Sequence, residues 1–241
     1  MHSVNIDDFD AVLFDLDGVL TPTAEVHQRA WRRMFIDYLL SRGIAEPYTD
    51  SDYFDYIDGR PRYDGVRSFL ASRDITLPEG SSSDPTDADT ICGLGNRKNA
   101  VFAAVLETEG VTPYPGSVAF LDHLATTGTR VAVVSSSRNA TAVLAAAGLA
   151  DRFEVVVDGV VAAAERLAGK PSPQTFLFAA QQLEVSADRA VVVEDALSGV
   201  EAGYAGDFGL VIGVDRGVGA DRLVQAGADL VVADLSELVT T

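Results

Sequence analysis

Two carboxylates, Asp15 and Asp17, follow a short apolar run near the start of the chain and have the spacing of a catalytic pair. The run, residues 11–14, is unbroken, which is typical of a strand buried on both faces of a parallel sheet. In extended backbone, residues two apart point the same way, so both carboxylates can face one small volume. Two like charges so close repel unless a cation lies between them or one carboxylate keeps its proton. Either arrangement is useful for catalysis.

A polar segment, Ser135 to Asn139, follows another apolar run and combines three serines with Arg138. Hydroxyls and free backbone N–H groups at a strand end that opens a helix can bind an anion, because a helix N-terminus carries partial positive charge. Serine and asparagine are also favoured helix N-caps, so capping is the simpler interpretation of this segment when it is taken alone.

Two further segments carry charge after predicted loops or strands. Lys170 lies in GKPSP, where two prolines can hold its side chain in one direction, and Glu194-Asp195 follows the apolar run 190–193. Together with Asp15 these residues predict a magnesium-dependent phosphoryl-transfer site. Asp15 and Asp195 would offer hard oxygen ligands to the metal ion. Ser135 and Lys170 would neutralise the phosphoryl oxygens. Asp15 would attack phosphorus in line, and Asp17 would act as the general acid and base.

Alternating apolar runs and helical segments in the second half of the chain would position these groups. Strands are expected at 131–134, 153–157, 190–193, 210–213 and 230–232, and helices at 117–126, 139–147 and 173–183. Repeated strand and helix predict a parallel, doubly wound α/β sheet, which binds ligands beyond the carboxyl ends of its strands.

An insertion separates the first strand from the rest of this pattern. Helical signals dominate it, with helices expected at 24–42, 63–72 and 97–108 and a polar surface loop at 81–90. We therefore expect a core domain formed by 1–22 and 113–241 and a helical domain formed by 23–112.

Composition limits the classes of function. The chain has 241 residues and a formal net charge of −18, which argues against nucleic-acid binding because that depends on clustered Lys and Arg. No segment approaches the about eighteen apolar residues of a membrane span, and no leader is recognised. The single cysteine, Cys92, fits a reducing compartment. We expect a cytoplasmic protein that acts on a small molecule, and no obligate protein partner is inferred.

The motifs resemble those of the haloacid dehalogenase superfamily. DLDGV at 15–19, Ser135, Lys170 and Glu194-Asp195 occur in the order of its four motifs. Within it, the sequence is similar to the β-phosphoglucomutase family in six further segments: TAEVHQRAW at 23–31, DGRPR at 58–62, NRKN at 96–99, YPG at 114–116, SSSRN at 135–139 and GKPSPQTF at 169–176. The resemblance implies a Rossmann-like core with an inserted helical cap domain.

For the catalytic centre, the resemblance implies that Asp15 is a nucleophile forming an aspartyl-phosphate and Asp17 the general acid/base. Mg²⁺ would be held by Asp15, the backbone carbonyl of Asp17 and Asp195, with Glu194 close by. Ser135 and Lys170 would hold the transferring phosphoryl group.

For the rest of the substrate, the resemblance implies a second phosphate site made by Arg62 of the cap with Ser137, Arg138 and Asn139 of the core. Arginine at 138 replaces a common lysine, and its planar fork should preserve the role. His27 and Lys98 match cap residues that position the substrate and Asp17. Taken alone, His27 could be a core histidine and Lys98 a solvated surface group.

The resemblance implies interconversion of β-glucose 1-phosphate and glucose 6-phosphate through the 1,6-bisphosphate. A magnesium-dependent sugar-phosphate phosphatase is the alternative, because it forms the same aspartyl-phosphate but gives it to water. A dehalogenase would not need Asp17 or the metal pair. A signalling receiver module, which uses phospho-aspartate as a switch, is disfavoured by the length of the chain and by the insertion.

Overall fold

The computed structural model describes residues 6–44 and 47–239, and the chain divides into two compact units. Met1–Pro22 and Val111–Thr241 form the first, which we call the core unit. Thr23–Gly110 forms the second, which we call the inserted unit.

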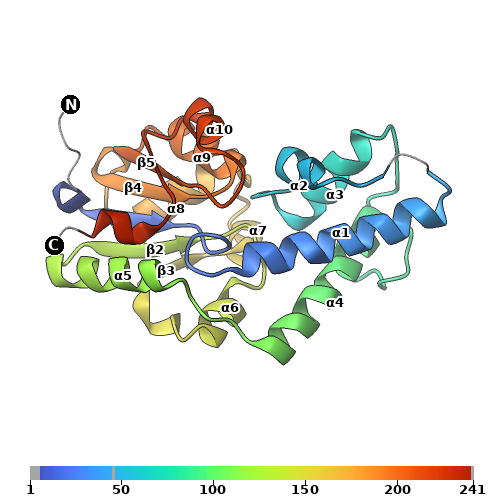
Figure 1. Ribbon diagram of the computed structural model, residues 1–241, viewed down its shortest axis with the longest axis horizontal. Helices are drawn as coiled ribbons and strands as arrows, with labels where there is room; N and C mark the ends of the chain where they lie inside the picture. Colours follow the sequence, from blue (N-terminus) through green and yellow to red (C-terminus); the bar gives the residue numbers. More distant parts are fainter. Residues whose placement is uncertain (1–5, 45–46, 240–241) are drawn as a thin grey trace. The chain divides into compact units, whose positions relative to one another are not determined.

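A parallel sheet of six strands in the order β3-β2-β1-β4-β5-β6 is the centre of the core unit (Figure 1). The strands are β1 Ala11–Phe14, β2 Arg130–Val134, β3 Val155–Val157, β4 Ala190–Glu194, β5 Leu210–Val214 and β6 Leu230–Val232. β1 is buried along its whole length because it pairs with β2 on one side and with β4 on the other. The predicted doubly wound α/β fold is confirmed.

Helices cover both faces of this sheet. They are α5 Pro115–Thr127, α6 Ala140–Ala146, α7 Gly159–Ala164, α8 Gln174–Gln182, α9 Leu197–Ala205 and α10 Ala220–Ala226, with short 3₁₀ turns at Ile6–Asp8, Ala150–Arg152, Ala187–Arg189 and Leu235–Leu238. Right-handed crossovers run from β1 in opposite directions, so α5 and α6 lie on one face and α8 to α10 on the other (Figure 1). Phe120 of α5 packs edge to face against Phe14 of β1, with the two ring centroids 5.9 Å apart.

The inserted unit is helical and has an aromatic core. Its helices are α1 Thr23–Ser41, α2 Asp50–Tyr56, α3 Arg62–Ala71 and α4 Ile91–Glu109. Phe35 of α1 and Phe69 of α3 pack with ring centroids 3.9 Å apart. A buried ion pair, 2.8 Å between Arg73 and Asp52, joins the end of α3 to α2.

Several helices differ from the sequence-based expectation. α4 begins at Ile91, not near residue 97, because Thr90 caps it by accepting a hydrogen bond from the Gly93 N–H at 2.9 Å. α2, α7, α9 and α10 were not predicted, and each has nine residues or fewer. Such short segments show little of a helical period. The loop expected at 81–90 contains no helix or strand.

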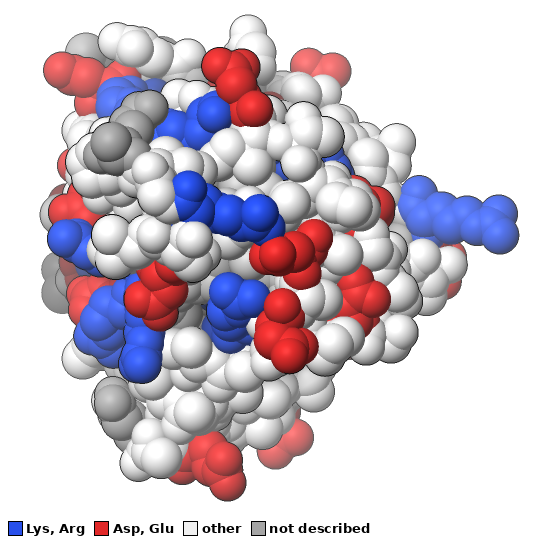
Figure 2. Space-filling model, turned by 90° about the vertical axis from the view of Figure 1, so that its right-hand side faces the viewer, with Lys and Arg blue, Asp and Glu red and all other residues white. Residues whose placement is uncertain are grey.

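Charged side chains of both signs are interleaved on the face shown in Figure 2. In the inserted unit, exposed arginines pair with nearby acids, as Arg32 does with Asp50 at 2.6 Å and Arg42 with Asp89 at 2.7 Å. Such pairing leaves little positive surface for a polyanion. Among the described residues, every helix is too short or too polar to cross a lipid bilayer.

Candidate active site

The predicted site residues of the core unit lie at the carboxyl ends of neighbouring strands. Asp15 directly follows β1 and Ser135 directly follows β2, while Asp195 directly follows β4. Backbone hydrogen bonds continue the sheet through the first two positions, because the Asp15 N–H donates to the Val193 carbonyl at 2.9 Å and the Ser135 N–H to the Val157 carbonyl at 3.0 Å. The sheet itself therefore fixes where these side chains begin.

Lys170 joins the carboxylates of two strands. Its ammonium donates to Asp15 Oδ1 and to Glu194 Oε1, both at 2.5 Å, and to the Val134 carbonyl at 2.9 Å. The ammonium also lies 4.9 Å from the ring centroid of Phe176, and only 3% of the residue is exposed. Burial lowers the pKa of Lys170, but Asp15 and Glu194 outweigh it and hold that pKa above its usual value. Lys170 is therefore a fixed positive charge inside the site.

Three carboxylates form a compact acidic cluster beside Lys170. One oxygen from each of Asp15, Glu194 and Asp195 lies within 4.8 Å of the others, and all three residues are buried. Burial raises the pKa of Asp15 well above its usual value, Glu194 and Asp17 act in the same sense, and Lys170 opposes them. A second positive charge would relieve this repulsion. Three hard oxygen donors close together are a suitable partial shell for a divalent cation.

Glu194 also holds the turn that presents Asp195. Its Oε2 accepts the backbone N–H groups of Asp195 and Ala196, both at 3.1 Å, while its Oε1 accepts from Lys170. A Cβ on Gly199 would lie 1.8 Å from Oε1, so α9 needs glycine there to approach this carboxylate. Both oxygens of Glu194 are thus used inside the protein.

Asp17 lies at the start of a tight turn and is half-buried. The turn closes through a 2.7 Å hydrogen bond from the Gly18 N–H to the Thr21 carbonyl. Gly18 has a φ of 92°, and a Cβ there would lie 1.8 Å from Asp195 Oδ2. The turn therefore passes directly against Asp195. The Asp17 side chain is not part of the cluster of carboxylate oxygens. This agrees with the expectation that only the backbone carbonyl of Asp17 would bind the metal ion.

The loop between β2 and α6 folds back on its own hydroxyls. Ser135 Oγ accepts the Ser137 N–H and Ser137 Oγ accepts the Asn139 N–H, both at 3.1 Å. Both hydroxyls act as acceptors in these bonds, which leaves their own hydrogens to donate to an anion. Asn139 occupies the N-cap position of α6, but its side chain makes no capping hydrogen bond. Arg138 is exposed, and its Cγ would lie 2.9 Å from a Cβ on Gly159.

His27 and Lys98 come together in the inserted unit. Lys98 Nζ is hydrogen-bonded to His27 Nδ1, and both residues are buried. Because an ammonium only donates, a charged Lys98 requires Nδ1 of His27 to be the acceptor. The His27 ring stacks on Phe102 at 3.9 Å, and Lys98 Nζ lies 5.0 Å from the Trp31 ring centroid. Lys98 is thus not the solvated surface group that it could have been on sequence alone.

Arg62 is the first residue of α3 and is half-buried. Its Nη2 donates to Asn99 Oδ1 at 2.7 Å, and the neighbouring Tyr63 hydroxyl donates to Asn96 Oδ1 at 3.0 Å. Two asparagines of α4, three residues apart, therefore orient the start of α3. Both asparagines belong to the NRKN segment at 96–99 but had no predicted role, although their spacing places them on one helical face.

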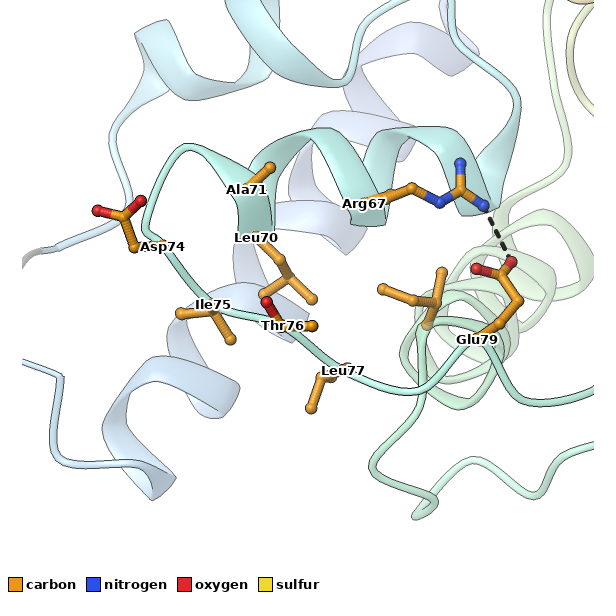
Figure 3. Close-up of a pocket in the computed structure, with 9 residues that line it drawn as sticks. Arg67, Leu70, Ala71, Asp74, Ile75, Thr76, Leu77 and Glu79 are labelled. Carbon is orange, nitrogen blue, oxygen red and sulfur yellow. Dashed lines mark hydrogen bonds and ion pairs between the residues drawn. The ribbon is translucent and has the colours of Figure 1, made fainter.

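A cavity of about 440 Å³ in the inserted unit does not belong to this constellation (Figure 3). Leu70 and Ile91, both buried, are among the residues that line it. Arg67 and Glu79, which also line it, form a 2.9 Å ion pair (Figure 3). None of the predicted site residues lines it. The described site residues thus form one cluster in the core unit and two hydrogen-bonded pairs, His27 with Lys98 and Arg62 with Asn99, in the inserted unit.

Comparison with known proteins finds a matching family model and similar mutases and phosphatases. The family model described as haloacid dehalogenase-like hydrolase matches residues 9–207. A β-phosphoglucomutase of Mycobacterium tuberculosis is 49% identical, covering 95% of this chain and 91% of that protein. Hexitol phosphatase A of Escherichia coli is 32% identical, covering 95% and 93%. The crystal structure of a β-phosphoglucomutase from Clostridium difficile superposes with a TM-score of 0.74 at 24% identity, covering 96% of this chain and 93% of that one.

Proposed function

Because the chain belongs to the haloacid dehalogenase-like hydrolase family, we propose that it interconverts β-D-glucose 1-phosphate and glucose 6-phosphate through the 1,6-bisphosphate. The observation that carries this proposal is the 49% identity to a β-phosphoglucomutase over almost the whole chain. The core unit then corresponds to the catalytic core domain and the inserted unit to the cap domain. The proposed substrate is a small sugar phosphate. A cytoplasmic location stays a prediction, and the single cysteine, which is buried and forms no disulfide, accords with it.

Asp15 is the nucleophile in this proposal. One of its carboxylate oxygens attacks phosphorus in line, forming the aspartyl-phosphate as the bond from phosphorus to the sugar oxygen breaks. Lys170 supports this role because its ammonium holds Asp15 Oδ1 at 2.5 Å and lies where the charge of a phosphoryl group would be neutralised. The Ser135 hydroxyl, at the adjacent strand end, donates to the same phosphoryl group.

Asp17 moves the proton. As the sugar oxygen leaves phosphorus, Asp17 gives it a proton, and in the reverse transfer Asp17 takes the proton from the hydroxyl that attacks the aspartyl-phosphate. Its half-buried position suits this exchange, because the carboxylate lies outside the acidic cluster formed by Asp15, Glu194 and Asp195. The 1,6-bisphosphate turns between the two transfers, so that the phosphoryl group returned to Asp15 comes from the other end of the sugar.

The cation that fits the acidic cluster is Mg²⁺ in this proposal, because it prefers hard oxygens and phosphate. Asp15, Asp195 and the backbone carbonyl of Asp17 would hold it, with Glu194 close by. When bound, it supplies positive charge to the phosphoryl oxygens.

The non-reacting phosphate is held by Arg62 together with Ser137, Arg138 and Asn139. The bond from Arg62 Nη2 to Asn99 Oδ1 and the bond from the Asn139 N–H to Ser137 Oγ support this assignment by fixing the directions of these side chains. His27 and Lys98 position the substrate from the cap, as their buried pair indicates.

A sugar-phosphate phosphatase is the second candidate, favoured by the 32% identity to a hexitol phosphatase. Both activities use Asp15, Asp17 and Lys170, and they differ in whether a sugar or water receives the phosphoryl group.

The deciding experiment supplies the enzyme with Mg²⁺, β-glucose 1-phosphate and a trace of the 1,6-bisphosphate, and measures glucose 6-phosphate and free phosphate together. We expect glucose 6-phosphate as the main product. Phosphate in excess over glucose 6-phosphate would establish the phosphatase instead.

Asp17→Asn tests the proton transfer within the same assay. We expect turnover to fall by about 10²–10⁴-fold, because general acid–base catalysis contributes on this scale. Magnesium binding, followed by calorimetry, should persist because the backbone carbonyl remains. An Asn variant with near-normal turnover would contradict the role of Asp17.

A further inference from the structure

Arg216 follows β5 and joins three separate segments of the core unit. Its Nε donates to the Gly18 carbonyl at 2.9 Å and its Nη1 to the Ala233 carbonyl at 3.0 Å. Its guanidinium carbon lies 3.9 Å from the centroid of the Tyr114 ring, and Nη2 lies 3.8 Å from Asp234 Oδ2. One side chain thus bonds the turn after Asp17, stacks on the segment that leads into α5, and bonds the chain after β6.

The loop after β5 is built to aim this side chain. Asp215 Oδ1 accepts the N–H groups of Gly217 and Gly219 at 2.9 and 3.0 Å, which closes the loop on itself. The two glycines have φ values of 118° and 99°, which residues with a Cβ rarely adopt. The loop therefore has a defined shape with Arg216 at a fixed point in it.

The turn that Arg216 holds carries Asp17. The Gly18 N–H bonds Thr21 inside the turn, and the Gly18 carbonyl bonds Arg216 outside it. The Gly18 N–H and the Asp17 carbonyl belong to one planar peptide and point in opposite directions. Fixing Gly18 on both sides therefore fixes the direction of the Asp17 carbonyl and the backbone from which the Asp17 carboxylate extends.

The segment with Tyr114 is tied to the same turn independently of Arg216. The Tyr114 N–H donates to the Leu20 carbonyl at 3.0 Å, and Ser117 Oγ donates to the Val19 carbonyl at 2.7 Å. The guanidinium covers this junction from the side of β5. Residues 18–20 are thus held by two chain segments that lie about one hundred and two hundred residues further along.

We propose that Arg216 is a positioning residue for the phosphoryl-transfer site, acting through the Gly18 carbonyl on the metal-directed carbonyl and the carboxylate of Asp17. The proposal rests on the proposed function in taking Asp15 and Asp17 as that site. Arginine suits the position because its planar fork can bond two carbonyls while its face stacks on Tyr114. Lysine has no planar face of the same kind to stack on Tyr114.

Arg216→Met tests the proposal, with Arg189→Met as the matched control. Arg189 donates through Nε and Nη2 to both carboxylate oxygens of Asp10 at 2.9 Å, at the opposite end of β1 from the site. For Arg216→Met we expect kcat to fall by roughly 10²-fold, the scale set by small misplacements of catalytic groups. The half-saturating magnesium concentration should rise, while KM for the sugar phosphate changes little. Arg189→Met should leave all three quantities unchanged.

Two further measurements separate positioning from folding and from substrate identity. Arg216→Lys should recover part of kcat, and Tyr114→Leu should lose part of it, with urea unfolding confirming that each variant is folded under assay conditions. Hydrolysis of acetyl phosphate requires Asp15 and the metal but no sugar, so it reports on the site even if the sugar is different. Arg216→Met with normal kcat and magnesium dependence would overturn the proposal, as would a loss explained entirely by the unfolded fraction.

Discussion

Replacing Lys170 by Met removes the charge that holds Asp15 and Glu194 together while keeping an unbranched apolar chain beside Phe176. The ammonium makes three hydrogen bonds in a site where Lys170 and Glu194 are 3% and 0% exposed. Removing one partner from a buried ion pair typically costs about 3–5 kcal/mol, because the other charge stays buried without compensation. We therefore expect the free energy of unfolding of Lys170→Met to fall by an amount in this range, near neutral pH and without metal.

Urea unfolding of the metal-free proteins measures this loss. Magnesium at a hundred times its dissociation constant should stabilise the variant by about 2.7 kcal/mol relative to its own metal-free form, since it binds only the folded acidic cluster. Lowering the pH should reduce the difference from wild type, because the uncompensated carboxylates can then take up protons. Arg189→Met, which removes an exposed ion pair with Asp10, should lower the free energy of unfolding much less, because solvent screens that pair. A loss for Lys170→Met no larger than for Arg189→Met would refute the reasoning.

Two further predictions concern the acidic cluster. Gly18→Ala should weaken magnesium binding while leaving the protein folded, because the new Cβ would lie 1.8 Å from Asp195 Oδ2 and must displace that carboxylate; unchanged affinity in a calorimetric titration would contradict it. Burial raises the pKa of Asp15, and a metal ligand must be ionised, so magnesium affinity should weaken as the pH falls through this raised pKa. The same titration at a series of pH values checks this, and affinity that stays constant down to about pH 5 would contradict it, since an ordinary aspartate is still ionised there.

The strands and most of the catalytic constellation were predictable because both depend on local patterns. Each strand is an apolar run, and the carboxyl ends of parallel strands meet at one edge, so Asp15, Ser135 and Asp195 had to lie there. Lys170 was expected near Asp15, and the structure gives it Glu194 as a second partner.

The parts that were not predicted depend on contacts distant in sequence. α9 contains Gly199 and Gly203, which lower helix propensity, but these glycines let the helix approach Glu194 and Val192. Arg216 has no local signal for its role, because its partners Gly18 and Tyr114 are identified only by the folded chain.

The burial of Lys98 in the inserted unit likewise depends on a contact distant in sequence. Its pairing with His27 joins residues 71 positions apart, and a charged residue on a helix is normally solvated. Only the packed helices reveal that this lysine is buried against aromatic rings.

The position of β1 at the middle of the sheet has a consequence for folding. Ala11 pairs with Arg130 on one side and Ala190 on the other, so β1 leaves the ribosome before the whole inserted unit and long before either partner. Until both partner strands have been synthesised, these four apolar residues are unpaired, and such a segment can aggregate or bind a chaperone. The acidic turn that follows, with Asp15 and Asp17, also acts as a charged flank that discourages intermolecular pairing of this segment. We infer that the two carboxylates to which the proposed function assigns the chemistry also protect the nascent chain.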